Sequence, residues 1–173
     1  MRACEDRKME APDLTGFARA LLDVEGEPER VLEIGCGEGD ATLFLAREYP
    51  RARVRGLDPS EAAVRAATDR VGLDPEGRVA FKIGDPRALP FPADHFDLVV
   101  QRHGRLDPAE IARVTRPAGS LIVPADARAG APLGFSRGAM RPLLARGFVA
   151  SPSGDGEFLL MRLAAAEAEA SRN

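Results

Sequence analysis

Aromatic residues are scarce in this sequence: they make up 5% of its 173 residues, with one tyrosine and no tryptophan. A site that stacks several nucleic-acid bases on aromatic rings is therefore disfavoured. A basic excess is missing as well, because the formal net charge is −3, whereas nucleic-acid binding usually shows a basic domain or patch. We therefore expect no nucleic acid among the partners.

Cysteine and long apolar runs are also lacking. Two cysteines, Cys4 and Cys36, are too few for a disulfide framework and favour a reducing compartment. No stretch approaches the roughly 18 apolar residues of a membrane-spanning helix, and the first residues, MRACEDRKMEAPD, contain no apolar signal-peptide core. The sequence predicts a cytoplasmic protein with no membrane partner, and it suggests no metal site.

An alternation of apolar runs and helix-like stretches is what the sequence does contain. Apolar runs predict strands at 31–34, 52–57, 78–83, 96–100 and 120–123, and helical spacing predicts helices at 40–49, 60–70 and 107–114. This alternation is typical of a doubly wound α/β fold, which is a mostly parallel sheet with helices on both faces.

The end of the chain changes in character. A helix is predicted at 136–148, with Pro142 a weak point in it, followed by two strands around SPSGDG that form an antiparallel hairpin. We expect one domain over residues 1–163, with a leading helix at about 13–25, a core at 30–163 and an Ala/Glu-rich tail at 164–173.

The stretch VLEIGCGEGDAT at residues 31–42 is the most informative one. Three alternating glycines, Gly35, Gly37 and Gly39, stand between a strand and a helix, and Glu33 is a carboxylate in an otherwise apolar strand. A buried carboxylate is costly unless it is paired or functional. Backbone freedom in a turn would account for one such glycine more readily than for three. The loop is therefore a candidate ligand site.

A phosphate-binding loop fits this stretch poorly. The dinucleotide fingerprint is G-x-G-x-x-G, whereas the spacing here is G-x-G-x-G and the next residue is Asp40, whose charge would repel a pyrophosphate. No G-K-[ST] follows, so a P-loop is excluded. A nicotinamide-dependent oxidoreductase is therefore a disfavoured alternative.

VLEIGCGEG resembles the first motif of the class I S-adenosylmethionine-dependent methyltransferases, which is an acid, an apolar residue and then G-x-G-x-G. Later stretches resemble the later motifs in the same order: VRGLDPS at 54–60, IGDPRALPFPADHFDLVV at 83–100, EIARVTRPAGSLIV at 110–123 and ARGFV at 145–149. The resemblance covers roughly residues 25–163. It implies a Rossmann-like sheet of seven strands, mostly parallel with an antiparallel last strand, and S-adenosyl-L-methionine as the cofactor.

The resemblance also implies which residues bind the cofactor. In the family the glycine loop approaches the methionine part, the strand acid holds the amino group, the acid after the second strand accepts from the ribose hydroxyls, and residues near the second and third strand ends surround the adenine. The matching positions here are Glu33, Gly35, Gly37, Gly39, Asp58, Pro59, Ser60, Gly84, Asp85 and Gln101. Pro59 and Ser60 would flank the adenine, Asp85 would accept from its amino group, and Gln101 would line the methionine side.

Plainer interpretations of two of these motifs stay open. Asp58-Pro59-Ser60 would also serve as a helix cap. Gly84-Asp85-Pro86 would also serve as a simple turn.

Methyl transfer from a sulfonium is a direct displacement, so much of the catalysis can come from holding the two reactants in line. A general base is needed only where the acceptor must lose a proton. His103, which follows the fourth strand, is the candidate catalytic base because imidazole titrates near neutrality. The alternative is that His103 packs or caps the next helix. No N-P-P-[YF] motif occurs, and the resemblance then implies a bacterial enzyme with a small-molecule acceptor.

The sequence departs from the family pattern in two places. The usual P-G-G turn is Pro117-Ala118-Gly119 here, and we expect Gly119 to take the positive φ angle. The chain is also short where the family builds its lid. Three alternatives follow: an open site, a homodimer or partner chain that completes the substrate site, or a protein that binds the cofactor without transferring methyl.

Overall fold

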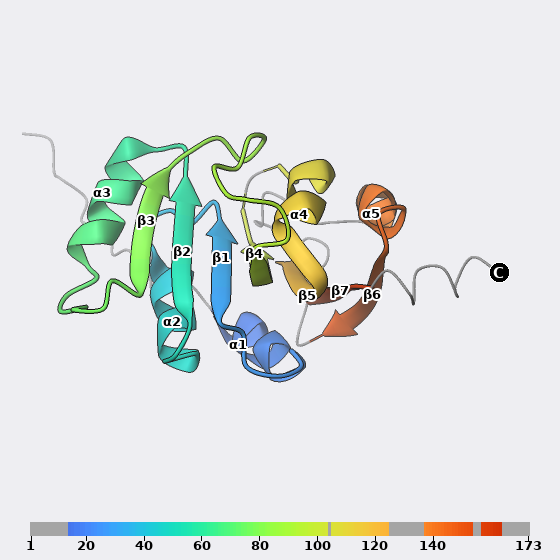
Figure 1. Cartoon of the computed structure of the whole chain (residues 1–173), viewed down its shortest axis with the longest axis horizontal. Coiled ribbons are helices and arrows are strands. Elements are labelled where there is room, and N and C mark those ends of the chain that lie inside the picture. The colour runs from blue at the N-terminus through green and yellow to red at the C-terminus, as the bar shows by residue number, and fades with distance from the viewer. Residues whose placement is uncertain (1–13, 104, 125–136, 154–156, 164–173) are drawn as a thin grey trace, which may run out of the picture.

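The computed structural model describes residues 14–103, 105–124, 137–153 and 157–163. Helices and strands alternate along most of them (Figure 1). The elements are α1 (Thr15–Leu22), β1 (Arg30–Ile34), α2 (Asp40–Glu48), β2 (Arg53–Asp58), α3 (Glu61–Asp69), β3 (Val79–Ile83), β4 (Phe96–Gln101), α4 (Pro108–Val114), β5 (Thr115–Pro124), α5 (Arg137–Leu144), β6 (Phe148–Ser153) and β7 (Glu157–Arg162).

The strands form one seven-stranded sheet in the order β3-β2-β1-β4-β5-β7-β6. The strands β1 to β5 pair in parallel, and β7 lies antiparallel between β5 and β6. The predicted fold class and the terminal hairpin are therefore confirmed. Strand order reverses between β1 and β4, and ligands bind at the carboxyl ends of strands beside such a reversal.

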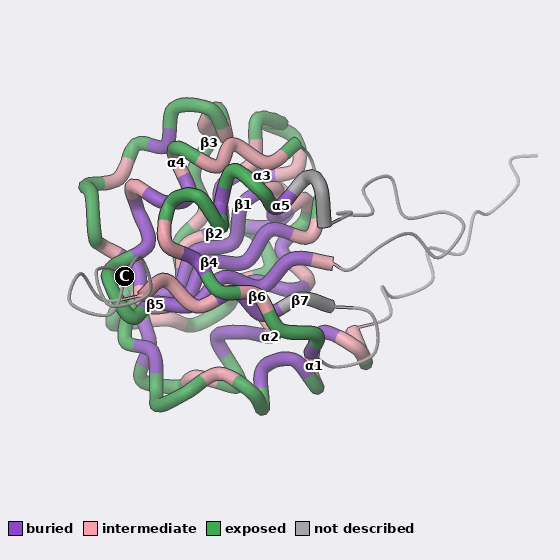
Figure 2. Tube along the Cα trace, turned by 90° about the vertical axis from the view of Figure 1, so that its right-hand side faces the viewer, coloured by how far each residue is buried: buried purple, intermediate pink, exposed green. Residues whose placement is uncertain are grey.

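Apolar side chains from both faces of the sheet form the core, as alternation along each strand requires. On one face Leu32 packs with Ile111 of α4 and Met140 of α5. On the other face Val31 packs with Leu45 of α2, and α1 joins the same cluster. Figure 2 shows buried residues following the central strands. Full burial of one such side chain contributes roughly 1.5–3 kcal/mol.

Two predicted helices end three or more residues earlier in the structure. The leading helix was predicted to extend to about residue 25, but α1 ends at Leu22. The helix predicted at 136–148 ends at Leu144, because Gly147 adopts a φ angle of 85° and Phe148 begins β6. Pro142 lies inside α5 two residues before its end. None of the helices in the described part of the chain is long and apolar enough to cross a membrane.

The turn before the apolar part of β5 differs from the prediction. Ala118, and not Gly119, takes the positive φ angle, at 59°. Gly119 is needed for space instead, because a Cβ there would lie 2.8 Å from the carbonyl oxygen of Arg116 and 3.1 Å from that of Asp97. The prediction about Gly119 was therefore wrong, and the left-handed conformation, which costs an L-residue roughly 1 kcal/mol, falls on the alanine.

The connection from β3 to β4 leaves part of the sheet uncovered. Residues 84–95 cross between these parallel strands without a helix, although such crossovers usually contain one. The helices α2 and α3 contact β2 and β3 from the other face. On the face that carries α4, no helix of the described residues stands in front of β1, β2 and β3 (Figure 1).

Candidate functional site

The glycine loop folds over the carboxyl end of β2. Its first residues are held there because the backbone N–H groups of Gly35 and Cys36 both donate to the carbonyl oxygen of Leu57, at 2.7 and 3.1 Å. Ile34, at the end of β1, pairs with Leu57 on one side and with Gln101 on the other. The ends of β1, β2 and β4 therefore meet around this loop, at the reversal of strand order.

The three glycines of the loop serve different purposes. A Cβ on Gly39 would lie 2.6 Å from the ring of Phe81, and one on Gly35 would lie 3.0 Å from the carbonyl oxygen of His103. These two glycines let the protein pack closely on itself. Gly37 has a φ angle of 52°, and no atom lies within 4 Å of the place where its Cβ would be. The loop therefore faces open space at Gly37, where a ligand could approach the backbone.

Asp58 connects the glycine loop to the start of α3. Its Oδ2 atom accepts a hydrogen bond from the N–H of Gly37 at 2.9 Å, and its Oδ1 atom accepts one from the N–H of Ser60 at 2.9 Å. Ser60 is the N-cap of α3 and accepts from the N–H of Ala63 at 3.3 Å. The helix-cap interpretation is thus correct for Ser60. Each carboxylate oxygen of Asp58 still has a free lone pair.

Glu33 is buried beneath the loop, with 2% of its surface exposed. Thr42, in the first turn of α2, donates its hydroxyl hydrogen bond to Oε2 of Glu33. Burial raises the pKa of Glu33 to about 7, although the Thr42 hydrogen bond and the charge of Arg102 oppose the rise. A cation bound beside Glu33 would favour the ionised form and lower this pKa.

Gln101 holds the segment that follows β4. Its side chain is buried, and its amide nitrogen donates to the carbonyl oxygens of His103 at 3.2 Å and Arg105 at 3.1 Å. Its Oε1 atom is buried and accepts no hydrogen bond from any described residue. An unsatisfied buried acceptor of this kind costs roughly 1–3 kcal/mol. Such an acceptor fits a ligand that brings an N–H donor.

His103 lies exposed beside the glycine loop. Partial desolvation and the charge of Arg102 lower the pKa of His103, while the charge of Asp58 opposes this. The imidazole is therefore mostly neutral near pH 7 and able to accept a proton. Arg102 itself lies with its guanidinium 5.2 Å from the ring centre of Phe17 on α1.

Asp85 lies at the outer side of the candidate site, exposed and in a turn. Arg87 donates to it from the backbone N–H at 2.9 Å and from the guanidinium at 2.8 Å, and this pair lowers the pKa of Asp85. A Cβ on Gly84 would lie 2.7 Å from a methyl carbon of Leu57, so Gly84 has a packing reason to be small. Pro59 is exposed between Asp58 and Ser60. An adenine amino group at Asp85 would share the carboxylate with Arg87.

Two residues without a role in the sequence prediction hold the segment that follows Asp85. The guanidinium of Arg113 donates to the carbonyl oxygens of Phe91 at 2.7 Å and Leu89 at 2.8 Å. Glu110 pairs with Arg113 at 2.7 Å and accepts from the N–H of Leu89 at 2.7 Å. The E-x-x-R spacing within the quoted motif was the available signal, and the structure gives it a bracing role.

Arg70 braces the other side of the glycine loop. From the C-cap of α3 its guanidinium donates to the carbonyl oxygen of Glu38 at 2.7 Å and to Oδ1 of Asp40 at 2.6 Å. These residues lie about thirty positions apart in the chain, so the sequence contains no local signal for the contact. Gly56 is a second residue whose role has no local signal in the sequence. A Cβ there would lie 2.9 Å from the Thr42 hydroxyl that donates to Glu33.

Metal and thiol chemistry find no support in the described part of the chain. No group of three or more His, Cys, Asp or Glu side chains there could hold a metal ion. Cys36 is buried, and burial together with the charges of Glu33 and Asp58 raises the pKa of its thiol to about 12. The thiol is therefore protonated at neutral pH and is a poor nucleophile.

A buried acid, an unsatisfied acceptor and an open glycine loop thus lie together at the reversal of strand order, where doubly wound sheets bind their ligands. The comparison with family models agrees: the methyltransferase domain family matches residues 31–119, just over half of the chain. The chain belongs to this family. S-adenosyl-L-methionine is accordingly its cofactor, as the resemblance in the sequence implied.

Similar proteins carry methyltransferase names. The chain is 37% identical over 110 residues to a fatty-acid O-methyltransferase of Mycolicibacterium smegmatis, covering 60% of this chain and 38% of the relative. It is 36% identical over 122 residues to a demethylmenaquinone methyltransferase of Thermus thermophilus, covering 64% of this chain and 54% of the relative. The chain thus spans about half or less of the length of these relatives.

A solved structure adds a different activity on the same fold. The [4+2]-cyclase SpnF superposes with a TM-score of 0.62 at 26% identity, covering 78% of this chain and 56% of that one. A methyltransferase of Aquifex aeolicus superposes with a TM-score of 0.64 at 19% identity, covering 82% of this chain and 86% of that one, and supports the fold alone.

Proposed function

We propose that the protein transfers a methyl group from S-adenosylmethionine to a small-molecule acceptor. The observation that carries the proposal is that a buried acid, Glu33, and an unsatisfied buried acceptor, Oε1 of Gln101, lie at the carboxyl ends of the neighbouring strands β1 and β4. The cofactor supplies a cationic methyl donor with an ammonium group. The ammonium group of such a ligand needs hydrogen-bond acceptors and a negative charge nearby. An anionic pyrophosphate would be repelled by the same negative charge.

Each residue of the proposed site has a task in this scheme. Glu33 accepts from the ammonium group, and Gln101 lines the methionine side. Asp58 accepts from the ribose hydroxyls on the lone pairs that Gly37 and Ser60 leave free. Asp85 accepts from the adenine amino group. The other named residues contribute space and backbone: Gly35, Gly37, Gly39, Pro59, Ser60 and Gly84.

The acceptor class follows from the relatives' names. A fatty-acid O-methyltransferase and a demethylmenaquinone methyltransferase both act on small molecules, which supports a small-molecule acceptor here. Residues 101–103, which follow β4, carry His103 next to the glycine loop and form the candidate acceptor side. The loop predicted from the sequence at 124–134 falls, after residue 124, outside the described residues.

Calorimetry with S-adenosylmethionine tests the first half of the proposal. We expect binding of S-adenosylmethionine and none of NAD under the same conditions. Asp58→Ala removes the ribose acceptor and the partner of the Gly37 N–H, so we expect roughly 1–2 kcal/mol of lost binding free energy. Asp69→Ala, an exposed acid at the end of α3, is the matched control. Unchanged affinity in Asp58→Ala would remove this residue from the site.

Turnover of labelled methyl groups with a metabolite extract tests the second half, and a pH profile tests His103. With the cofactor saturating, we expect kcat of the wild type to fall on the acidic side of neutrality as the imidazole becomes protonated. His103→Gln should lack this acidic limb while it still binds the cofactor. A mutant profile that keeps the limb would assign His103 to packing only.

A protein that binds the cofactor without transferring methyl is the second candidate. The observation that favours it is the [4+2]-cyclase among the similar structures, since that protein's name describes a reaction other than methyl transfer. Normal cofactor binding with no labelled product from any extract would support this candidate over the first.

A further inference from the structure

The uncovered part of the sheet carries an unusual set of side chains. These side chains lie on the same face of the sheet as α4. Leu32, which packs with α4 in the core, is paired with Arg55, and Arg55 is paired with Ala80. Paired residues of parallel strands point to the same face. The open sheet face consists of Arg30 on β1, Arg53 and Arg55 on β2, and Ala80 and Lys82 on β3.

Four of these five residues are cations, and they lie close together. Arg30 pairs directly with Arg53 across the two strands, an arrangement of like charges that destabilises a sheet. Partial burial lowers the pKa of His95. The charges of Arg30 and Arg55 lower it further, and the charge of Asp97 opposes this. His95 therefore lies beside the same cluster. Unlike this face, the whole chain is acidic, with a net charge of −3.

The acids nearby are engaged with other groups. Asp97 pairs with Arg116 at 2.7 Å and accepts from the backbone N–H groups of Glu29 and Arg30. Asp74, whose charge acts on Arg55, accepts from the N–H of Val79. Within the described residues, no ion pair joins Arg30, Arg53 or Arg55 to an acid.

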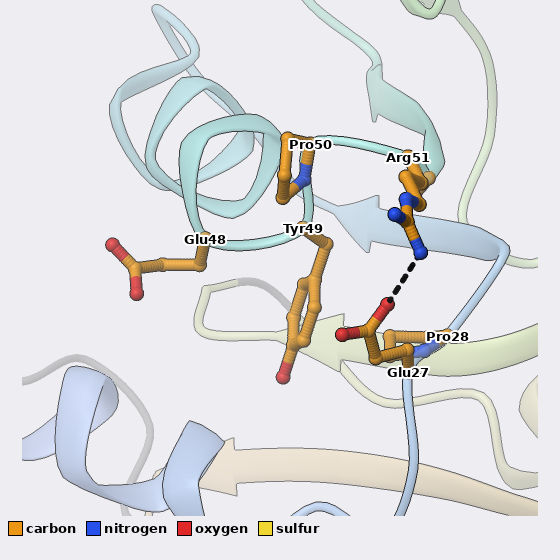
Figure 3. A pocket seen from close by; sticks show the side chains of 7 residues that line it. Glu27, Pro28, Glu48, Tyr49, Pro50 and Arg51 are labelled. Atoms are coloured by element: carbon orange, nitrogen blue, oxygen red, sulfur yellow. Dashed lines mark ion pairs between the residues drawn. The ribbon is translucent and has the colours of Figure 1, made fainter.

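A pocket of about 370 Å³ opens at the lower end of this face. Its lining is Glu27, Pro28, Glu29, Arg30, Arg51 and Arg53. Figure 3 shows an adjoining pocket with three of the same residues, in which the Glu27 carboxylate turns toward Arg51, with 4.0 Å between the charged atoms. These two charges therefore pair with each other, while Arg30 and Arg53 line the pocket as a like-charged pair.

We propose that the open sheet face docks an acidic helix of a partner protein. Parallel sheets are normally covered on both faces, and a helix about 10 Å wide would cover two strands spaced about 4.8 Å apart. Carboxylates four residues apart on a helix lie about 6 Å apart, which matches the roughly 6.6 Å between Arg53 and Arg55 along one strand. Ala80 is small and exposed, and it offers the apolar contact between these charges.

Nucleic acid fits the same face less well. The acidic side chains of Glu27 and Glu29 line the adjoining pocket, so a continuous phosphate backbone would meet repulsion there. No described aromatic residue belongs to the open sheet face, so stacking would not contribute. A nucleic acid is therefore the competing outcome to test against.

The test uses a fluorescent alanine-based peptide of about 18 residues with Glu at every fourth position, and a Lys-containing version as the control peptide. Fluorescence anisotropy should show binding of the acidic peptide only, weakened at least tenfold between low salt and about 0.2 M salt. Arg53→Glu should weaken binding at least tenfold. Arg65→Glu, an exposed arginine on α3, is the matched control and should change it less than about twofold.

Folding and location are checked separately. Arg53→Glu places an acid opposite Arg30, so its melting temperature should equal or exceed that of the wild type. Amide chemical shifts should move most in residues 53–57 and 79–82 on addition of the peptide. The proposal would be overturned if Arg53→Glu bound the peptide as well as the wild type does, or if the chemical shifts moved elsewhere. It would also be overturned by tighter binding of an oligothymidylate of similar length, or by self-association of the wild type that Arg53→Glu abolishes.

Discussion

Glu33→Gln is expected to stabilise the folded protein by about 3 kcal/mol at about pH 8 and by almost nothing near pH 4. The pKa of Glu33 rises from 4.5 to about 7 on folding, mainly because the carboxyl is buried. At 1.36 kcal/mol per pH unit, this rise gives the stated magnitude. The amide is neutral at every pH and keeps an acceptor for the Thr42 hydroxyl.

The sign follows from proton binding. Below pH 4.5 Glu33 is protonated in both states, so its ionisation contributes nothing to the difference between the proteins. Between 4.5 and about 7 the folded state holds a proton that the unfolded state has lost, and the wild type therefore loses stability as the pH rises through this window. Urea unfolding at both ends of the window measures the effect.

Glu38→Gln is the control, because it makes the same substitution on an exposed side chain of the same loop. Its effect on the free energy of unfolding should stay within about 0.5 kcal/mol at both pH values. If Glu33→Gln raised the free energy of unfolding equally at both pH values, packing and not ionisation would be responsible.

Affinity for S-adenosylhomocysteine, the product form of the cofactor, is expected to fall about a hundredfold from pH 8 to pH 5. The pKa of Glu33 is about 7 in the free protein, and the proposed contact with the ligand's ammonium group needs the ionised carboxylate. Each pH unit below 7 therefore lowers the competent fraction about tenfold. Calorimetry across this range measures it, and heats in two buffers of different ionisation enthalpy report the released proton.

Glu33→Gln provides the control for this effect as well. The variant should bind more weakly than the wild type at about pH 8, and its affinity should vary little between pH 5 and 7, because position 33 no longer titrates. A wild-type affinity that stays constant across the range would remove Glu33 from contact with the ammonium group and leave its role structural.

The sequence predicts well those parts of the fold that depend on neighbouring residues. Hydrophobic periodicity located β1 and α2 to within a residue or two, and Asp107-Pro108 marked the start of α4, where the carboxylate accepts from two N–H groups at 3.0 Å. The glycine loop also lies within a few residues of Glu33, so its position at the strand end could be predicted. These features are encoded locally.

Features that depend on register or on distant contacts could not be predicted. The pairing of Arg30 with Arg53 depends on which residues of two strands lie opposite each other, and sequence spacing alone does not determine that. The bracing of the loop by Arg70 joins α3 to the start of α2. Ala118 takes the positive φ angle, and Gly119 is small where the carbonyl oxygen of Asp97 approaches it, which is a tertiary contact.

Asp58 has a consequence for the thermodynamics of ligand binding. Its two oxygens accept from the N–H groups of Gly37 and Ser60 within the protein itself, so its rotamer is fixed when the chain folds. The entropy of ordering this side chain is therefore lost during folding and not during association. A ligand that donates two hydroxyl groups meets a receptor already in its bound geometry, which favours an association whose rate is set by encounter and not by rearrangement.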